Sequence, residues 1–114
     1  MSMTIKQIQE WEKSFVKRKG ISLDEESGLK IGTLKLMEEV GEVMKAILEN
    51  KWQEVPAEIA DIIIFACKIA NIVESYHGVD KLSDVLERKI HYVETRTYNK
   101  VINKFNKPKN KEFK

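Results

Sequence analysis

Five acidic side chains in two short segments are the residues of this chain best suited to chemistry. The first segment, "LKLMEEVGEVMKAI" at 34–47, places Glu38, Glu39 and Glu42 within one apolar helical pattern. Like charges three or four residues apart on a helix repel one another and destabilise it slightly. The cluster therefore indicates either a solvated outer face or an inward-facing group that binds a cation.

The second segment, "PAEIADIII" at 56–64, carries Glu58 and Asp61, which lie three residues apart and so share a helix face. Asp61 directly precedes the apolar residues "IIIF", where an unpaired buried carboxylate is costly. Either a basic side chain or a metal ion must therefore neutralise it. Oxygen ligands favour Mg²⁺ or Mn²⁺, and no His or Cys has the spacing that would indicate zinc.

The connection between these two segments, about 49–55, is short, which predicts two antiparallel neighbouring helices. On such neighbours the two pairs of carboxylates can converge on one point. Glu49 and Glu54 are expected to be solvated instead. We therefore predict a metal site with four carboxylate ligands: Glu39, Glu42, Glu58 and Asp61.

Hydrophobic periodicity predicts an all-α fold. Apolar residues recur at helical spacing in four stretches: about 3–19, 29–50, 56–76 and 80–102. Gly20 and Gly78 end the first and third stretches, Pro56 suits a first helical turn, and Asp80 is a candidate N-cap. No stretch alternates polar and apolar residues convincingly, so no strands are expected. The predicted architecture is a four-helix bundle.

The third stretch is apolar on more than one face, from Ile59 through Ile62–Phe65 to Val73. A helix of this kind lies at the centre of a bundle or at a subunit interface. Because one small domain can hardly surround it, we predict that the bundle is completed by self-association, with residues 62–73 buried in a homodimer or homotetramer.

The composition, 42% hydrophobic and 33% charged residues in a chain of 114, is typical of a single helix-rich domain. The single Cys67 excludes an intrachain disulfide and fits a reducing cytoplasm, which is the expected location. No signal peptide is expected, and the apolar run 59–73 is shorter than the roughly 20 residues that span a bilayer.

Charge is unevenly distributed along the chain. The segment 103–114 carries five Lys and one Glu, a net charge of +4, whereas the remaining residues sum to −2. We expect a helical domain at 1–102 and a frayed basic tail at 103–114. The tail could contact nucleic acid, but a solubilising role is favoured.

Two motifs carry a resemblance to a known family. "EEVGE" at 38–42 and "EIAD" at 58–61, separated by fifteen residues, resemble the EExxE…ExxD signature of the MazG-like, all-α nucleotide pyrophosphohydrolases. The resemblance covers about residues 1–98. It implies an Mg²⁺-dependent enzyme, with Mn²⁺ as an alternative metal, that cleaves nucleoside triphosphates between the α- and β-phosphates into a monophosphate and pyrophosphate.

The resemblance also implies roles for individual residues. Glu39, Glu42, Glu58 and Asp61 would hold the metal, and Glu38 would bind it through water or position the attacking water. Lys89 and Arg96, seven residues apart on the expected fourth helix, would contact phosphate, and Trp11 would stack on the base; surface or core positions are the alternatives. Val93 stands where many relatives carry Asn, so nucleotide preference can differ.

Two other classes remain open. A di-iron carboxylate bundle needs two Glu-x-x-His elements, and this chain has only Glu74 with His77. A non-catalytic helical interaction or nucleic-acid-binding module would explain the apolar third helix, but it gives the acidic residues no role.

Overall fold

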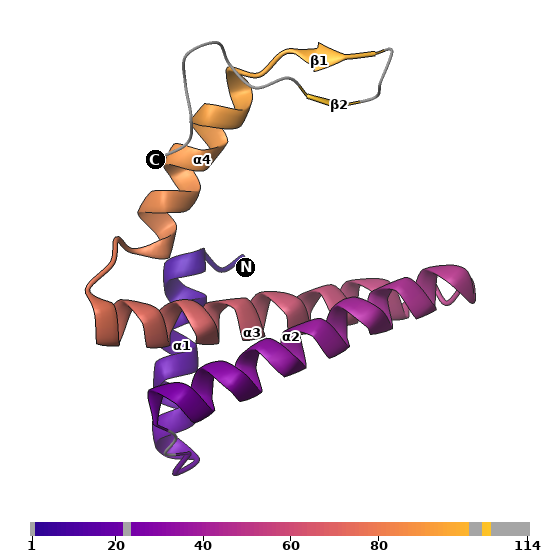
Figure 1. Ribbon diagram of the computed structural model, residues 1–114. Helices are drawn as coiled ribbons and strands as arrows, with labels where there is room; N and C mark the ends of the chain where they lie inside the picture. Colours follow the sequence, from indigo (N-terminus) through magenta and orange to yellow (C-terminus); the bar gives the residue numbers. More distant parts are fainter. Residues whose placement is uncertain (1, 22–23, 101–103, 106–114) are drawn as a thin grey trace. The chain divides into compact units, whose positions relative to one another are not determined.

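The computed structural model describes residues 2–21, 24–100 and 104–105 (Figure 1). The chain divides into two compact units, one ending at Val79 and the other beginning at Asp80. The first unit holds the helices α1 (Ile5–Arg18), α2 (Glu25–Leu48) and α3 (Glu54–His77). The second unit holds the helix α4 (Leu82–Glu94) and the short strands β1 (Tyr98–Asn99) and β2 (Lys104–Phe105). The predicted all-α class is confirmed.

Local hydrogen bonds set where the first two helices begin. The Thr4 side chain accepts from the backbone N–H of Gln7 while the Gln7 side chain accepts from the backbone of Thr4, so α1 begins with a capping box. Asp24 accepts from the N–H of Ser27 at 2.7 Å, and this bond lowers the pKa of the Asp24 carboxyl. Because Asp24 caps it, α2 begins four residues before the predicted start at residue 29.

The helices α2 and α3 form an antiparallel hairpin, as the short connection predicted, and lie side by side in Figure 1. The turn between them contains Asn50, whose φ of 57° is a left-handed conformation that Asn tolerates better than most residues. Gly32 permits close contact further along the pair: a Cβ added there would lie 3.2 Å from Cγ1 of Ile69. A Cβ added at Gly41 would meet no atom within 4 Å. Gly32 therefore permits close approach of the two helices.

A buried polar network holds α1 where it crosses α3 (Figure 1). Gln9 Nε2 donates to Asn71 Oδ1 at 2.9 Å and to Glu74 Oε2 at 2.8 Å. Asn71 Nδ2 in turn donates to Glu12 Oε1 at 2.7 Å. Lys68 Nζ lies 3.7 Å from Glu12 Oε2 and supplies a positive charge. Every buried side-chain polar atom in the described part of the chain has a hydrogen-bond partner, which limits the cost of burying these groups.

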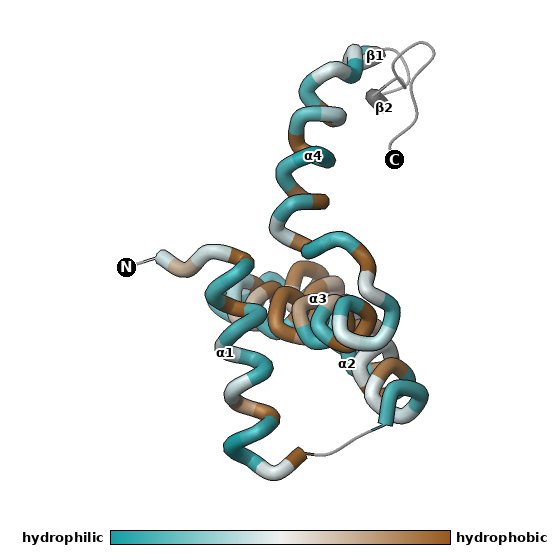
Figure 2. The backbone as a smooth tube through the Cα atoms, turned by 90° about the vertical axis from the view of Figure 1, so that its left-hand side faces the viewer, coloured by the Kyte–Doolittle hydropathy of each residue, from teal (hydrophilic) through white to brown (hydrophobic). Residues whose placement is uncertain are grey.

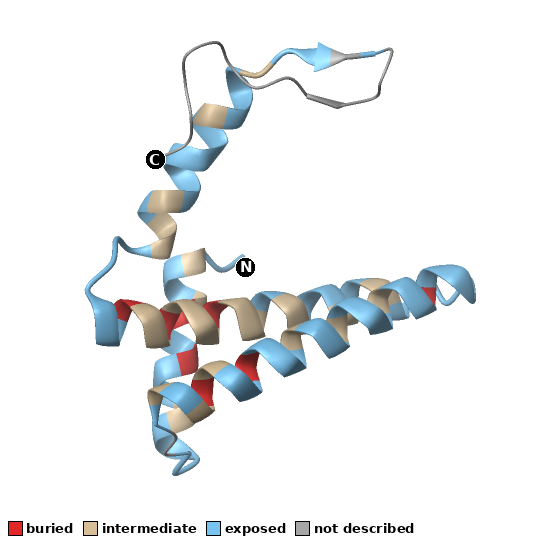
Figure 3. Ribbon diagram, viewed as in Figure 1, coloured by how far each residue is buried: buried red, intermediate tan, exposed pale blue. Residues whose placement is uncertain are grey.

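Few apolar side chains are completely covered. Among the described residues, Ala46 and Cys67 are the buried hydrophobic ones. Buried positions gather mainly where α1 crosses α3 and along the first half of α2 (Figure 3). Much of α3 is strongly hydrophobic (Figure 2), yet Ile59 and Ile63 remain 42% and 38% exposed. Burial of residues 62–73 in an oligomer stays a prediction.

The second unit differs from the predicted fourth helix. That helix was expected to reach residue 102, but α4 ends at Glu94. Thr95, Thr97 and Tyr98 follow, and β-branched and aromatic residues favour extended backbone over helix. β1 then pairs antiparallel with β2, with Tyr98 opposite Phe105, so the expectation of no strands was wrong for this hairpin.

Two further expectations concern the ends of this unit. Asp80 was the predicted N-cap of the fourth helix, but Lys81 occupies that position and Asp80 binds Arg88 Nη2 at 2.9 Å instead. The predicted basic tail, 103–114, lies outside the described residues except for Lys104 and Phe105.

No described helix is both long and apolar enough to cross a membrane.

The contact at Gly32 gives a testable consequence. Gly32→Val should lower the free energy of unfolding by about 1–3 kcal/mol, because the added carbons press on Ile69 in the α2–α3 contact. Gly41→Val is the matched control and should change stability by no more than about 0.5 kcal/mol. Urea unfolding of both variants measures the difference. Equal effects at the two glycines would show that Gly32 does not control the packing.

Candidate metal centre and active site

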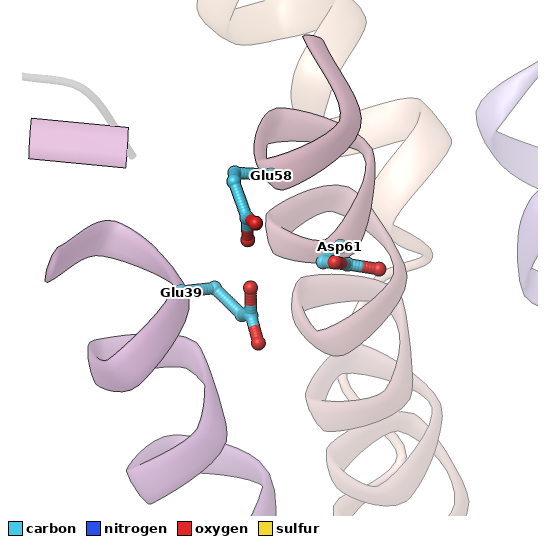
Figure 4. A group of neighbouring side chains, drawn as sticks. All are labelled: Glu39, Glu58 and Asp61. Atoms are coloured by element: carbon cyan, nitrogen blue, oxygen red, sulfur yellow. The ribbon is translucent and has the colours of Figure 1, made fainter. Parts of the chain in front are cut away.

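Three of the predicted ligands come together between α2 and α3. One carboxylate oxygen each from Glu39, Glu58 and Asp61 lies within 4.8 Å of the others. Glu39 belongs to α2, whereas Glu58 and Asp61 lie one turn apart on α3 (Figure 4). All three side chains are half-buried, so the group is partly shielded yet reachable from solvent.

The electrostatics of this group favour binding of a cation. The pKa of Glu39 is raised to about 7, first by a hydrogen bond that its protonated carboxyl donates to Glu58 and then by burial. The negative charges of Glu58, Asp61 and Glu38 raise it further. Below about pH 7 and without a metal, Glu39 therefore retains a proton, which relieves repulsion between the carboxylates. A divalent cation can replace that proton, and three carboxylates are a donor set that suits Mg²⁺ or Mn²⁺.

The other two acidic residues of the first motif lie at exposed positions of α2. Glu42 follows Glu39 by three residues and so lies one turn further along the helix. Glu38 Oε2 lies 3.4 Å from Lys35 Nζ. Neither belongs to the three-carboxylate group of Glu39, Glu58 and Asp61. Their roles as fourth ligand and water-positioning residue stay predictions.

Trp11 lines an apolar pocket of about 330 Å³ in the first unit. Its ring stacks on Phe15 with centroids 5.1 Å apart. The other residues of the pocket come from α1, α3 and the segment before α1: Met3, Ile8, Ala60, Ile63 and Ile64. Ile64, one of the residues that line this pocket, lies one turn after Asp61 along α3.

The two predicted phosphate contacts lie in the second unit. Lys89 is on α4, and its Nζ lies 5.2 Å from the centroid of the Tyr92 ring. Arg96 follows the end of α4, and its backbone N–H donates to the carbonyl of Val93 at 3.0 Å. The expectation that Lys89 and Arg96 share one helix face was therefore wrong, because the helix ends before Arg96.

A second pocket was not predicted from the sequence. It has a volume of about 290 Å³ and lies beside the polar network between α1 and α3. Glu12, Lys68 and Asn71 line it together with Ile72 and Tyr76. In the sequence, Lys68 and Asn71 stand out as polar residues inside an otherwise apolar run, which indicates that they have polar partners. The sequence does not show that these partners lie on α1.

An all-α hairpin that gathers carboxylates from two helices defines a class of helical protein suited to binding divalent cations. Residues 29–106 match the model of the MazG nucleotide pyrophosphohydrolase domain. The chain belongs to this family. Searches of curated proteins and of solved structures gave no match.

The raised pKa of Glu39 predicts how stability depends on pH and metal. The folded protein binds a proton at Glu39 between the ordinary pKa of 4.5 and about 7, whereas the unfolded chain does not. This contribution to stability is complete below the ordinary pKa and is lost as the pH rises through about 7. Without metal, the melting temperature should therefore fall between about pH 5 and about pH 8.

Saturating Mg²⁺ should raise the melting temperature more at the higher pH, because Mg²⁺ binds ionised carboxylates. At a Mg²⁺ concentration one hundred times the Kd, binding should stabilise the folded protein by about 2.7 kcal/mol. Glu39→Gln should remove most of both effects, whereas Glu10→Gln, at an exposed position on α1, should preserve them. A parent protein whose melting temperature ignores Mg²⁺ at both pH values would contradict the metal site.

Proposed function

We propose that this protein is a metal-dependent nucleoside triphosphate pyrophosphohydrolase that cleaves ribo- or deoxyribonucleotides between the α- and β-phosphates. The products would be a nucleoside monophosphate and pyrophosphate. The observation that carries the proposal is the convergence of Glu39, Glu58 and Asp61 within 4.8 Å in a chain of the MazG family.

The carboxylates would hold Mg²⁺, or Mn²⁺ in its place, against the triphosphate. Glu39, Glu58 and Asp61 would be ligands, with Glu42 as the fourth from the next turn of α2. A bound divalent cation supplies Lewis-acid stabilisation of the charge that develops on the phosphoryl oxygens. Glu38 would orient the water that attacks the α-phosphorus. The helical hairpin would keep these side chains in place before substrate arrives.

The substrate contacts are proposals of the same kind. Trp11 would pack against the base, a role supported by the apolar pocket that it lines. Lys89 and Arg96 would balance the negative charge of the phosphates. Many relatives carry Asn where this chain has Val93, and Val93 would not make the contact that this Asn makes. The protein would act as a homodimer or homotetramer, with neither a membrane nor nucleic acid as its partner.

A non-catalytic helical or nucleic-acid-binding module is the alternative function. It would leave the carboxylate group and the proton held by Glu39 without a role. Salt-sensitive DNA binding together with no hydrolysis of any nucleoside triphosphate would favour that alternative.

Amide substitutions test the metal ligands. Glu39→Gln, Glu42→Gln, Glu58→Gln and Asp61→Asn each remove a charge while nearly preserving shape. Each should slow Mg²⁺-dependent pyrophosphate release by about 100-fold or more, because metal stabilisation supplies several kcal/mol and 1.36 kcal/mol corresponds to tenfold in rate. Glu49→Gln, at the exposed end of α2, should stay within about twofold of the parent. Full activity in all four variants would exclude the proposed site.

The position of attack makes a separate prediction. In ¹⁸O-water, attack at the α-phosphorus should place the label in the nucleoside monophosphate and leave pyrophosphate unlabelled, as mass spectrometry can measure. Label found only in pyrophosphate would place the attack at the β-phosphorus. Orthophosphate as the first product would exclude this reaction.

A further inference from the structure

The backbone of Lys51 is fixed in the connection that joins α2 to α3 (Figure 1). Its N–H donates to the Ala46 carbonyl at 2.8 Å, and the Asn50 N–H donates to the Ile47 carbonyl at 3.1 Å. With the left-handed conformation of Asn50, these two bonds form a Schellman motif that ends α2. The Lys51 carbonyl accepts from the N–H of Glu54, the first residue of α3. Lys51 is therefore tied to both helices of the hairpin.

Glutamates continue from the metal centre towards this connection on both helices. Glu49, the C-cap of α2, follows Glu42 by seven residues and so lies on the same side of the helix. On α3, Glu54 precedes Glu58 by four residues and shares its face. The end of the hairpin beyond the metal centre is therefore acidic, and Lys51 adds a positive charge to it.

The ammonium of Lys51 interacts with three of these carboxylates. Its Nζ lies 3.2 Å from Glu49 Oε1, and this contact is the main cause of the raised pKa of Lys51. The charges of Glu54 and Glu42 raise this pKa further, so Lys51 lies within electrostatic reach of the predicted fourth metal ligand. The side chains of Lys51 and Glu49 are 51% and 41% exposed, and exposed ion pairs contribute little stability. The ammonium can therefore exchange Glu49 for a more highly charged anion.

The two directions along the hairpin from the metal centre differ in polarity. Away from the connection, Asp61 is followed by Ile62 and Phe65, and then by the contact of Ile69 with Gly32. Towards the connection lie the charged residues described above. Phosphate charge is costly to place beside apolar side chains. The β- and γ-phosphates of a substrate whose α-phosphate lies at the metal therefore fit the end that holds the connection, where they need a cation among the glutamates.

We propose that Lys51 binds the β- and γ-phosphates and stabilises the departing pyrophosphate, an inference that rests on the proposed attack at the α-phosphorus. In that reaction the water oxygen bonds to the α-phosphorus and a proton of the water is lost to solvent. The bond from the α-phosphorus to the bridging oxygen breaks, and its electron pair stays on pyrophosphate. The ammonium leaves Glu49, keeps its own proton and offsets this charge. Lys51 thus adds a cation of the first unit to Lys89 and Arg96 of the second.

Product inhibition distinguishes this role from a structural one. The inhibition constants of pyrophosphate and of the nucleoside monophosphate would be measured with Mg²⁺ and the common nucleoside triphosphate that the parent hydrolyses fastest. Lys51→Met should raise the constant for pyrophosphate at least about tenfold, because a charge-assisted contact is lost, and should lower kcat/KM by a similar factor. The constant for the monophosphate should stay within about twofold, since this product lacks the β- and γ-phosphates.

Two control variants accompany this measurement. Lys51→Arg keeps the positive charge and should bring the constant for pyrophosphate back to within about threefold of the parent. Lys6→Met, the same change of side chain at an exposed position on α1, should alter neither constant. Equal constants for pyrophosphate in the parent and in Lys51→Met, or a parallel rise of both constants, would overturn the proposal.

Calorimetric binding of inorganic pyrophosphate with Mg²⁺ tests the same contact without catalysis. Lys51→Met should weaken this binding at least about tenfold. Its helix content by circular dichroism should match the parent, and it should bind Mg²⁺ alone at least as tightly, since a positive charge has been removed. A parent that binds pyrophosphate through Lys51 but hydrolyses no triphosphate would support this contact and exclude the proposed function. A parent that hydrolyses triphosphates but loses nothing in Lys51→Met would exclude the contact alone.

Discussion

The packing of α2 against α3 must outweigh the electrostatic repulsion between the carboxylates that it brings together. Packing Gly32 against Ile69 brings the two helices close, and the same approach gathers Glu39, Glu58 and Asp61 within 4.8 Å. Three carboxylates at that distance cannot all ionise without cost, and the proton retained by Glu39 up to about pH 7 is the response of the folded protein. Binding a divalent cation would expel this proton. Metal uptake and proton release would therefore be coupled at this site.

The α1–α3 crossing relies on a different kind of interaction. The crossing contains four buried polar residues joined by hydrogen bonds: Gln9, Glu12, Asn71 and Glu74. A satisfied polar network accepts few alternative registers, because a shifted helix would leave buried donors and acceptors unpaired. This network therefore specifies how α1 lies on α3, while the apolar residues around it supply less directional attraction.

The acidic hairpin could be predicted because its signals are local. The i, i+3 spacing of Glu58 and Asp61, the short connection and the apolar periodicity together determine an antiparallel pair with inward carboxylates. The end of α4 could not be predicted, since Val93 and Val101 continue a helical pattern across residues that prefer extended backbone. The partners of Lys68 and Asn71 could not be identified from the sequence either, because they lie about sixty residues earlier in the chain. Helical spacing indicates which side of a helix is buried but does not identify the element that buries it.

Cys67 lies where α1, α3 and the polar network meet, and its side chain is almost completely inaccessible. Burial raises the pKa of its thiol, and the nearby carboxylates of Glu12 and Glu74 raise it further. The thiol of Cys67 is therefore unreactive for two reasons: reagents cannot reach it, and little of it is ionised to the reactive thiolate. As the single cysteine of the chain, it makes the native protein resistant to thiol reagents until unfolding around α3 exposes the thiol. The rate at which a thiol-specific label attaches would then report how often this part of the protein opens, without any engineered probe.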